Sequence, residues 1–237
     1  MKRMLLLVSV AVLAACAGVR TPDPESGGIT FVHLNDTYRV GTVEDGNAGG
    51  FSRAVSVIRN LQEDGRDVRV LHGGDFLYPS LESSLWDGMQ MVDAFNFMDE
   101  LAPMYVVAGN HEFDRRTSAQ LSAAIDASRF DWLGDNYTLQ TGDTAVDSAL
   151  QSSFTFAANG KTIGVFALTL HPDDGGNVRD YLAVEKDYVA VAESVIEQFE
   201  ARGVDAIIAY AFAHVAGRRD CPAARPPSDV RFCRRRS

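Results

Sequence analysis

The stretch that decides the fold is Met104-Tyr105-Val106-Val107-Ala108-Gly109-Asn110-His111-Glu112-Phe113-Asp114. Its first half is an apolar run with the length and composition typical of a short β-strand. Its second half places an amide, an imidazole and two carboxylates directly after a glycine. Turns favour Gly, Asn and Asp, but a turn has no need of an adjacent His-Glu pair followed by another Asp. We therefore interpret residues 104–114 as a strand that ends in a chemical site.

Two other apolar strands end in polar side chains. Residues 29–34 lead into Asn35-Asp36, and residues 68–72 lead into Gly73-Gly74-Asp75. Segments with helical spacing of apolar residues lie between and after the strands, at 51–61, 89–98, 118–127 and 188–199. A β-hairpin of 153–158 and 162–168 around Asn159-Gly160, and a last strand at 204–209, complete the pattern. This alternation predicts an α/β sandwich with a largely parallel sheet, whose ligands gather beyond the carboxyl ends of the strands.

The polar residues at these strand ends suit a metal-assisted phosphate site. Asp36 and Asp75 supply hard oxygen ligands, Asn110 adds a neutral oxygen, and Asp75 is the better placed to bridge two cations. Two metals about 3.5–4 Å apart would clamp a phosphoryl group and activate water. His111 would stabilise the developing charge or protonate the leaving oxygen, and Asp114 would orient its imidazole.

These residues also carry a family resemblance, over roughly residues 29–209. The motifs His33-Leu34-Asn35-Asp36, Gly49-Gly50-Phe51-Ser52-Arg53, Gly73-Gly74-Asp75-Phe76 and Gly109 to Asp114 resemble the N-terminal catalytic domain of bacterial 5′-nucleotidases, within the calcineurin-like metallophosphoesterases. The resemblance implies a four-layer α/β/β/α domain and a dinuclear metal centre (Mn, Zn, Mg, Ca and Co are not distinguished). It also implies Asn110 as a metal ligand, a His111–Asp114 catalytic dyad, and nucleotides or related phosphate esters as substrates.

The sequence departs from the family pattern at several metal ligands. The first family motif is Asp-x-His, whereas this chain has Asp36-Thr37-Tyr38, so Tyr38 is a weak ligand at best. The next family histidine corresponds only loosely to His214, which comes about two residues late, and no Gly-His-x-His occurs in the sequence. We therefore expect a sandwich that is incomplete at its C-terminal side, a weakened metal centre, and reduced or absent activity.

The N-terminal residues have the pattern of an export signal. Lys2 and Arg3 precede an apolar segment too short to span a bilayer, and Leu13-Ala14-Ala15-Cys16 resembles the lipobox of bacterial lipoproteins. We expect residues 1–15 to be a signal peptide, Cys16 to be lipidated, and residues 16–28 to be a flexible tether. The protein would then be an exported, membrane-anchored lipoprotein, periplasmic or on the cell surface. An ordinary cleaved signal with an incidental cysteine is the alternative.

Charge and cysteine content exclude two classes of protein. The net charge of −10 argues against a partner that is a nucleic-acid polymer, and the absence of cysteine from 17 to 220 excludes a disulfide scaffold.

The C-terminal residues differ in charge from the rest of the chain. Residues 210–237 carry a net charge of +5, which leaves −15 for residues 1–209. This Arg- and Pro-rich tail, for which we expect no regular structure, suggests a change of reading frame and an early stop. The alternative is a basic tail that contacts anionic lipid.

The remaining histidines and tryptophans are expected to have structural roles. His33 and His72 are predicted to be core or hydrogen-bonded, with His72 a candidate support for the metal site, and Trp86 and Trp132 are predicted to be core. The function predicted is hydrolysis of phosphate monoesters, with a small nucleotide as partner. A phosphodiesterase or sugar-nucleotide hydrolase on the same scaffold, a non-catalytic metal- or nucleotide-binding surface lipoprotein, and a non-functional fragment remain open alternatives.

Overall fold

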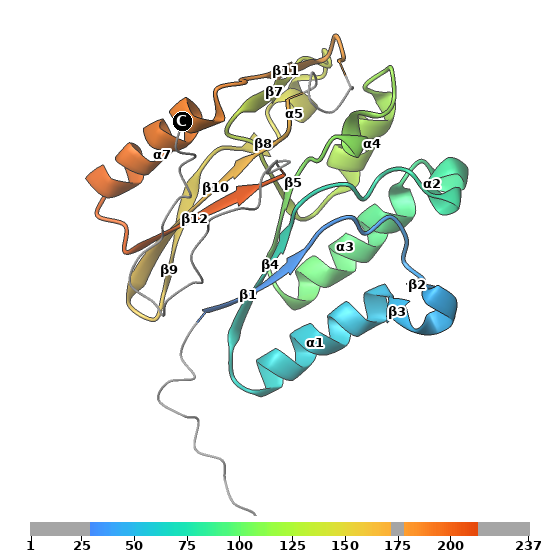
Figure 1. Cartoon of the computed structure of the whole chain (residues 1–237), viewed down its shortest axis with the longest axis horizontal. Helices are drawn as coiled ribbons and strands as arrows, with labels where there is room; N and C mark the ends of the chain where they lie inside the picture. The colour runs from blue at the N-terminus through green and yellow to red at the C-terminus, as the bar shows by residue number, and fades with distance from the viewer. Residues whose placement is uncertain (1–28, 172–177, 213–237) are drawn as a thin grey trace, which may run out of the picture.

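The computed structural model describes residues 29–171 and 178–212 (Figure 1). Two β-sheets face each other, and helices cover the outer face of each. The predicted signal peptide, Cys16, the tether, His214 and nearly all of the predicted tail lie outside the described residues. Within the described ranges no helix is both long enough and apolar enough to span a membrane.

The larger sheet contains five parallel strands in the order β1-β4-β5-β6-β8. These strands are β1 (Ile29–Leu34), β4 (Asp67–His72), β5 (Met104–Val107), β6 (Asp131–Leu133) and β8 (Leu150–Gln151). The register pairs Leu34 with His72 and His72 with Val106, so the chain leaves β1, β4 and β5 at one edge of the sheet. The three polar segments that follow these strands are therefore brought together there.

The smaller sheet has the order β12-β10-β9, from β9 (Phe154–Ala158), β10 (Lys161–Leu168) and β12 (Ala206–Ala211). The β9–β10 hairpin is confirmed, with positive φ at both turn residues, Asn159 (52°) and Gly160 (73°), as a type I′ turn requires. The last strand was predicted two residues too early. It runs to Ala211 because Tyr210, which is buried, continues the parallel ladder with β10.

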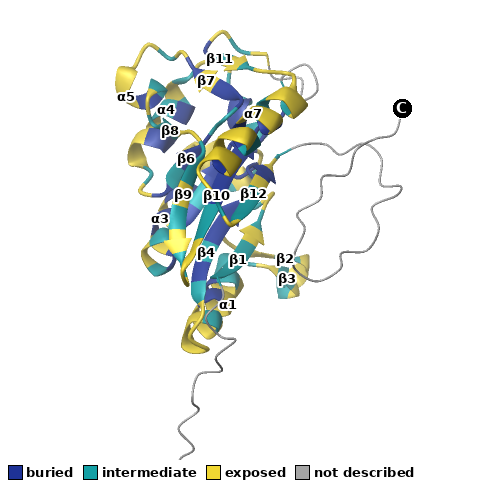
Figure 2. Cartoon of the chain, turned by 90° about the vertical axis from the view of Figure 1, so that its left-hand side faces the viewer, coloured by how far each residue is buried: buried dark blue, intermediate teal, exposed yellow. Residues whose placement is uncertain are grey.

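Helices complete the four layers. The longer helices are α1 (Phe51–Glu63), α3 (Met89–Leu101), α4 (Ala119–Ala127) and α7 (Tyr188–Ala201), and the shorter ones are α2 (Leu81–Trp86), α5 (Thr144–Asp147) and the single turns Glu44–Gly46 and His111–Phe113. Two small antiparallel pairs are β2 (Thr42–Val43) with β3 (Ala48–Gly49), and β7 (Tyr137–Leu139) with β11 (Leu182–Val184). Helices α1 and α3 cover the larger sheet, α7 covers the smaller one, and the outer faces of α1 and α7 are exposed (Figures 1 and 2). The predicted α/β/β/α sandwich is confirmed.

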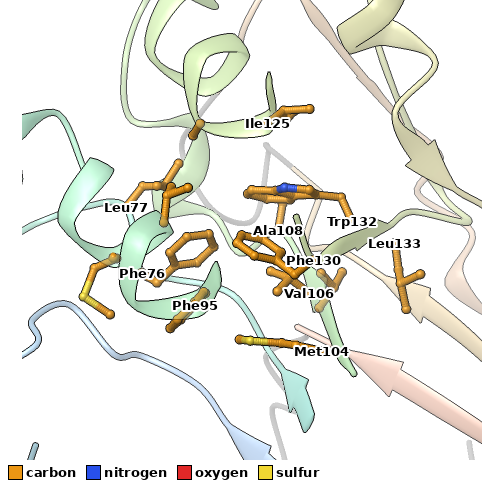
Figure 3. Close-up of a cluster of buried hydrophobic side chains, with 14 of the residues drawn as sticks. Phe76, Leu77, Phe95, Met104, Val106, Ala108, Ile125, Phe130, Trp132 and Leu133 are labelled. Carbon is orange, nitrogen blue, oxygen red and sulfur yellow. The ribbon is translucent and has the colours of Figure 1, made fainter. Parts of the chain in front are cut away.

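Buried aromatic side chains cluster around Phe76 (Figure 3). The Phe76 ring, which directly follows Asp75, packs 4.6 Å from Phe95 and 5.5 Å from Trp132, measured between ring centroids. Burial of Phe76 therefore anchors the loop after β4. Trp132 is core as predicted, but the prediction for Trp86 is wrong: it is 55% exposed, because α2 lies at the surface of the fold.

Candidate functional site

Backbone hydrogen bonds join the loops that follow β1 and β4. The Gly73 N–H donates to the Leu34 carbonyl at 2.7 Å, and the Asp36 N–H donates to the Gly74 carbonyl at 3.1 Å. These bonds extend the parallel β1–β4 pairing past the ends of the strands. They fix Asp36 and Asp75 relative to one another before any side-chain interaction is considered.

The loops after β4 and β5 pack so closely that two glycines are required. A Cβ on Gly74, whose φ is +94°, would lie 2.2 Å from the Gly109 nitrogen, and a Cβ on Gly109 would lie 2.2 Å from the Asp75 Oδ1. The two carboxylates themselves occupy left-handed backbone, with φ of 54° at Asp36 and 62° at Asp75. Such strained backbone is concentrated at functional sites, where the surrounding structure holds it in place.

A buried carboxylate ties these two loops together. The Glu112 Oε2 accepts hydrogen bonds from the N–H groups of Asp75 (2.7 Å) and Gly109 (2.6 Å). Its Oε1 accepts from the N–H groups of Phe76 (2.8 Å) and Leu77 (3.0 Å). Burial, followed by the nearby charge of Asp75, raises the pKa of Glu112 to about 7, although the backbone donors oppose this shift. Glu112 is thus the main structural support of the loop that carries Asp75.

His72 supports the same loops from below. Its Nδ1 accepts a hydrogen bond from the Gly74 N–H at 3.1 Å, so the proton of a neutral ring is on Nε2, which is 2.7 Å from the Thr37 hydroxyl. Burial lowers the pKa of His72 to about 3, with a smaller contribution from His33, and the ring is neutral. His72 therefore connects the residue after Asp36 with the residue before Asp75, which agrees with its predicted supporting role.

Tyr38 lies between the two candidate metal-ligating carboxylates. Its hydroxyl donates to the Asp36 Oδ1 at 2.9 Å and is 3.3 Å from the Asp75 Oδ2. Burial, then the hydrogen bond to Asp36 and the charge of Asp75, raises the pKa of Tyr38, so the phenol stays protonated. Burial also raises the pKa of Asp75. Interactions with His111 and Tyr38 oppose this rise but do not cancel it. A single neutral donor therefore joins two acidic side chains.

The two residues of the predicted dyad, His111 and Asp114, are in contact at the start of the loop after β5. The His111 Nδ1 is 2.9 Å from the Asp114 Oδ2, and the His111 backbone N–H donates to the Asp75 Oδ1 at 2.9 Å. Partial burial alone would lower the pKa of His111, but the Asp114 hydrogen bond and the charges of Asp75, Asp114 and Glu112 together raise it. The Arg179 guanidinium donates to the backbone carbonyl of Asp114 at 2.8 Å and so braces this turn.

The oxygen donors fit a hard divalent cation. Asp36, Asp75 and Asn110 face one cavity of about 430 Å³, together with His111 and Tyr38. Carboxylate and amide oxygens are the ligands that Mg²⁺, Mn²⁺ and Ca²⁺ prefer. Residues 29–171 and 178–212 contain no cluster of three or more His, Cys, Asp or Glu side chains suited to a metal ion. Among the described residues, Asp36, Asp75 and Asn110 are therefore the candidate oxygen ligands for a cation in this cavity.

A second cavity, of about 550 Å³, adjoins the first. Its lining is mostly apolar, with Phe51 and Val57 from α1 and Met91 and Phe95 from α3. The two cavities share Asn35, Asp36 and Tyr38 as lining residues. The site therefore combines a polar compartment at the strand ends with an apolar one against the helices.

The structure brings together most of the residues that the sequence indicated. Asp36, Tyr38, Asp75, Asn110, His111 and Asp114 all gather at one edge of the larger sheet. His33 differs from its prediction as a core or hydrogen-bonded residue, because it is exposed and packs its ring on Tyr210 at the cavity wall, 5.3 Å between centroids. The roles of Glu112 and Arg179 were not predicted from the sequence. The adjacency of Glu112 to His111 was a signal for the former, and no local signal marks the latter.

Two known proteins are similar in sequence to part of this chain. The chain is 24% identical over 155 residues to an apyrase of Aedes albopictus and 29% identical over 130 residues to a probable 5′-nucleotidase of Treponema pallidum (strain Nichols). The matches cover 59% and 48% of this chain but only 27% and 21% of those relatives.

Solved structures show the same fold at low identity. A 5′-nucleotidase precursor from Thermus thermophilus superposes with a TM-score of 0.62 at 22% identity, over 76% of this chain and 36% of that one. NAD nucleotidase from Haemophilus influenzae gives a TM-score of 0.61 at 21% identity, over 76% and 33% of the two chains. The family model described as calcineurin-like phosphoesterase matches residues 29–234. The chain belongs to the calcineurin-like phosphoesterase family.

Proposed function

We propose that this chain is a metal-dependent phosphoric monoester hydrolase of the 5′-nucleotidase type. The observation that carries the proposal is the convergence of Asp36, Asp75, Asn110 and His111 on one cavity, with Asp114 hydrogen-bonded to His111. The names of its relatives, an apyrase and a probable 5′-nucleotidase, support nucleotides as the substrate class. The chain spans only about a quarter of those relatives, so its substrate is inferred from the site as well as from them.

Members of this family typically bind two divalent metal ions. In this chain Asp36, Asp75 and Asn110 would hold a cation at the strand ends. When bound there, a divalent cation acts as a Lewis acid toward phosphoryl oxygens and lowers the pKa of water.

His111 is the group placed to move a proton. Its Nδ1 is committed to the Asp114 carboxylate, which leaves Nε2 as the ring nitrogen that acts on a substrate in the cavity. Asp114 and the other acidic neighbours raise the pKa of His111 despite its partial burial, so they favour the imidazolium. In the proposed reaction the imidazolium stabilises the charge on the phosphate and donates its proton to the leaving oxygen.

The adjoining apolar cavity supports an ester with an organic leaving group of some size. The phosphate would lie in the polar cavity beside Asp75, and the organic part would cross Asn35 and Tyr38 to reach Phe51 and Val57.

The proposed site of action is outside the cytoplasm, on extracellular or periplasmic nucleotides. The apolar segment before Cys16 in the sequence supports this location and supports a lipid-anchored protein.

Phosphate release from a substrate panel tests the function. The full chain would be assayed with adenosine 5′-monophosphate, p-nitrophenyl phosphate, a nucleoside diphosphate sugar and bis(p-nitrophenyl) phosphate, after EDTA treatment and after adding back Mn²⁺, Mg²⁺, Zn²⁺, Ca²⁺ or Co²⁺. The proposal expects release from monoesters that a cation restores. Preference for the diester or the sugar nucleotide would assign a different hydrolase on the same scaffold. Thermal stabilisation by nucleotide without any release would indicate a non-catalytic binding protein.

A further inference from the structure

Each carboxylate oxygen of the Asp36–Asp75 pair already has a partner within the protein. The Asp36 Oδ1 accepts from the Tyr38 hydroxyl at 2.9 Å, and the Asp36 Oδ2 accepts from the Asn35 side-chain amide. The Asp75 Oδ1 accepts from the His111 backbone N–H at 2.9 Å, and the Asp75 Oδ2 lies 3.3 Å from the same Tyr38 hydroxyl. One oxygen of each carboxylate is thus directed at the same phenol.

The Tyr38 side chain is held in that gap from its other side as well. Its ring meets the His111 ring edge-on, with centroids 5.9 Å apart and an interplanar angle of 82°. The side chain is therefore positioned by the imidazole through its ring and by two carboxylates through its hydroxyl. A shift of Tyr38 out of the gap would break both hydrogen bonds and the ring contact together.

A phenol in this position partly replaces a cation in stabilising the two carboxylates. Two nearby carboxylates repel each other, and a donor placed between them offsets that repulsion as a bridging cation would. A neutral phenol, however, is a donor with one proton and a poor ligand for a hard cation. Each carboxylate oxygen retains a lone pair, so a cation can still bind to Asp36 or Asp75, but a cation placed between the two carboxylates would have to displace the hydroxyl.

We propose that Tyr38 makes this site mononuclear: its hydroxyl joins Asp36 to Asp75 in the place that a second divalent ion would otherwise require. The proposal rests on the cation-binding part of the proposed function. It departs from the two-metal pattern typical of the family, and it identifies Tyr38 as one of the residues responsible for that departure. It also makes Tyr38 a positioning residue for the carboxylates, with no direct role in proton transfer.

The test is the number of Mn²⁺ ions bound by the full chain, measured by equilibrium dialysis with elemental analysis and by electron paramagnetic resonance. The expected result is one Mn²⁺ in the wild type, with the six-line spectrum of an isolated ion. Tyr38→Phe removes only the hydroxyl and should bind one Mn²⁺ several-fold more tightly, because no hydrogen bond is displaced. Tyr38→His supplies a ligand nitrogen and should bind two, with a spin-coupled spectrum.

Tyr105→Phe is the matched control. Tyr105 lies in the middle of the larger sheet, and its hydroxyl has no hydrogen-bond partner among the described residues, so Mn²⁺ binding should not change. Two Mn²⁺ ions in the wild type would overturn the proposal while leaving metal-dependent hydrolysis intact. One ion in both the wild type and Tyr38→His would show that Tyr38 does not set the stoichiometry. No bound Mn²⁺ in any variant would overturn the proposal together with its cation site, and phosphate release, measured separately, would then decide the hydrolase function.

Discussion

Glu112→Gln is the substitution that most sharply tests how the site loops are held. The carboxylate accepts four backbone hydrogen bonds of 2.6–3.0 Å from a fully buried position. A glutamine has the same shape, but only its oxygen can accept, so its NH₂ group would face two N–H donors. A hydrogen bond to a charged acceptor contributes about 1.5–3 kcal/mol, so losing two of the four predicts a loss of about 3–6 kcal/mol in the free energy of unfolding.

Urea unfolding and thermal melts followed by circular dichroism would measure this loss. At pH 8 the wild-type carboxylate, with its pKa raised to about 7 chiefly by burial, is mostly ionised. For a domain of this size a loss of 1 kcal/mol lowers Tm by about 2–4 °C, so a decrease of at least about 6 °C is expected. Glu63→Gln, at an exposed position at the end of α1, is the control and should change stability by less than about 0.5 kcal/mol. If Glu112→Gln lies within about 1 kcal/mol of the wild type, the carboxylate does not hold the loops as described.

Three further predictions concern proton transfer, pH and substrate size. Partial burial lowers the pKa of His111, and the hydrogen bond and charge of Asp114, together with the charges of Asp75 and Glu112, raise it above its ordinary value. Asp114→Asn removes the first two of these contributions, so the alkaline limb of the kcat–pH profile should move to lower pH. A limb that stays in place would contradict the dyad. Burial lowers the pKa of His72 to about 3 in the folded protein, against about 6.5 in the unfolded chain. The unfolded chain therefore takes up a proton that the folded protein does not, and the wild type should lose up to about 1.4 kcal/mol of stability per pH unit as the pH falls below about 6.5. His72→Gln should not show this His72-linked loss of stability at low pH. Urea unfolding of both proteins at pH 7 and pH 5 would measure it, and an equal change in stability between the two pH values in both proteins would contradict the prediction. Val57→Trp, at a half-exposed position that lines the apolar cavity, should lower kcat/KM about tenfold for aryl and nucleoside esters but not for glycerol phosphate, and an equal effect on both would refute the cavity's role.

The strands and the loops that carry the site could be predicted because their signals are local. Apolar runs such as 104–108 identify strands by themselves, and polar residues after three parallel strands must meet at one sheet edge. The pair His111–Asp114 lies within one turn, so its spacing alone indicates contact. Elements of two or three residues, such as β6 and β8, were not predicted. They are strands because they pair with neighbouring strands in the sheet, and their own composition does not mark them.

Side-chain roles that depend on distant segments could not be predicted in this way. The donors to Glu112 lie mainly at residues 75–77, more than thirty positions earlier in the chain. The position of the Tyr38 hydroxyl between two carboxylates likewise requires the β1–β4 register, which the sequence does not state. Arg179 braces the carbonyl of Asp114 from a segment 65 residues away, and no motif marks it.

The central claim is that the cavity holding Asp75 and His111 hydrolyses phosphate monoesters. The most direct measurement is kcat/KM for release of phosphate from adenosine 5′-monophosphate and p-nitrophenyl phosphate with saturating Mn²⁺. It would compare the wild type with Asp75→Asn, His111→Ala and the Glu63→Gln control. We predict hydrolysis by the wild type and the control, and losses of at least about 100-fold in kcat/KM for Asp75→Asn and His111→Ala. Phosphate release by Asp75→Asn equal to that of the wild type, or none by a folded wild type that binds Mn²⁺, would contradict it.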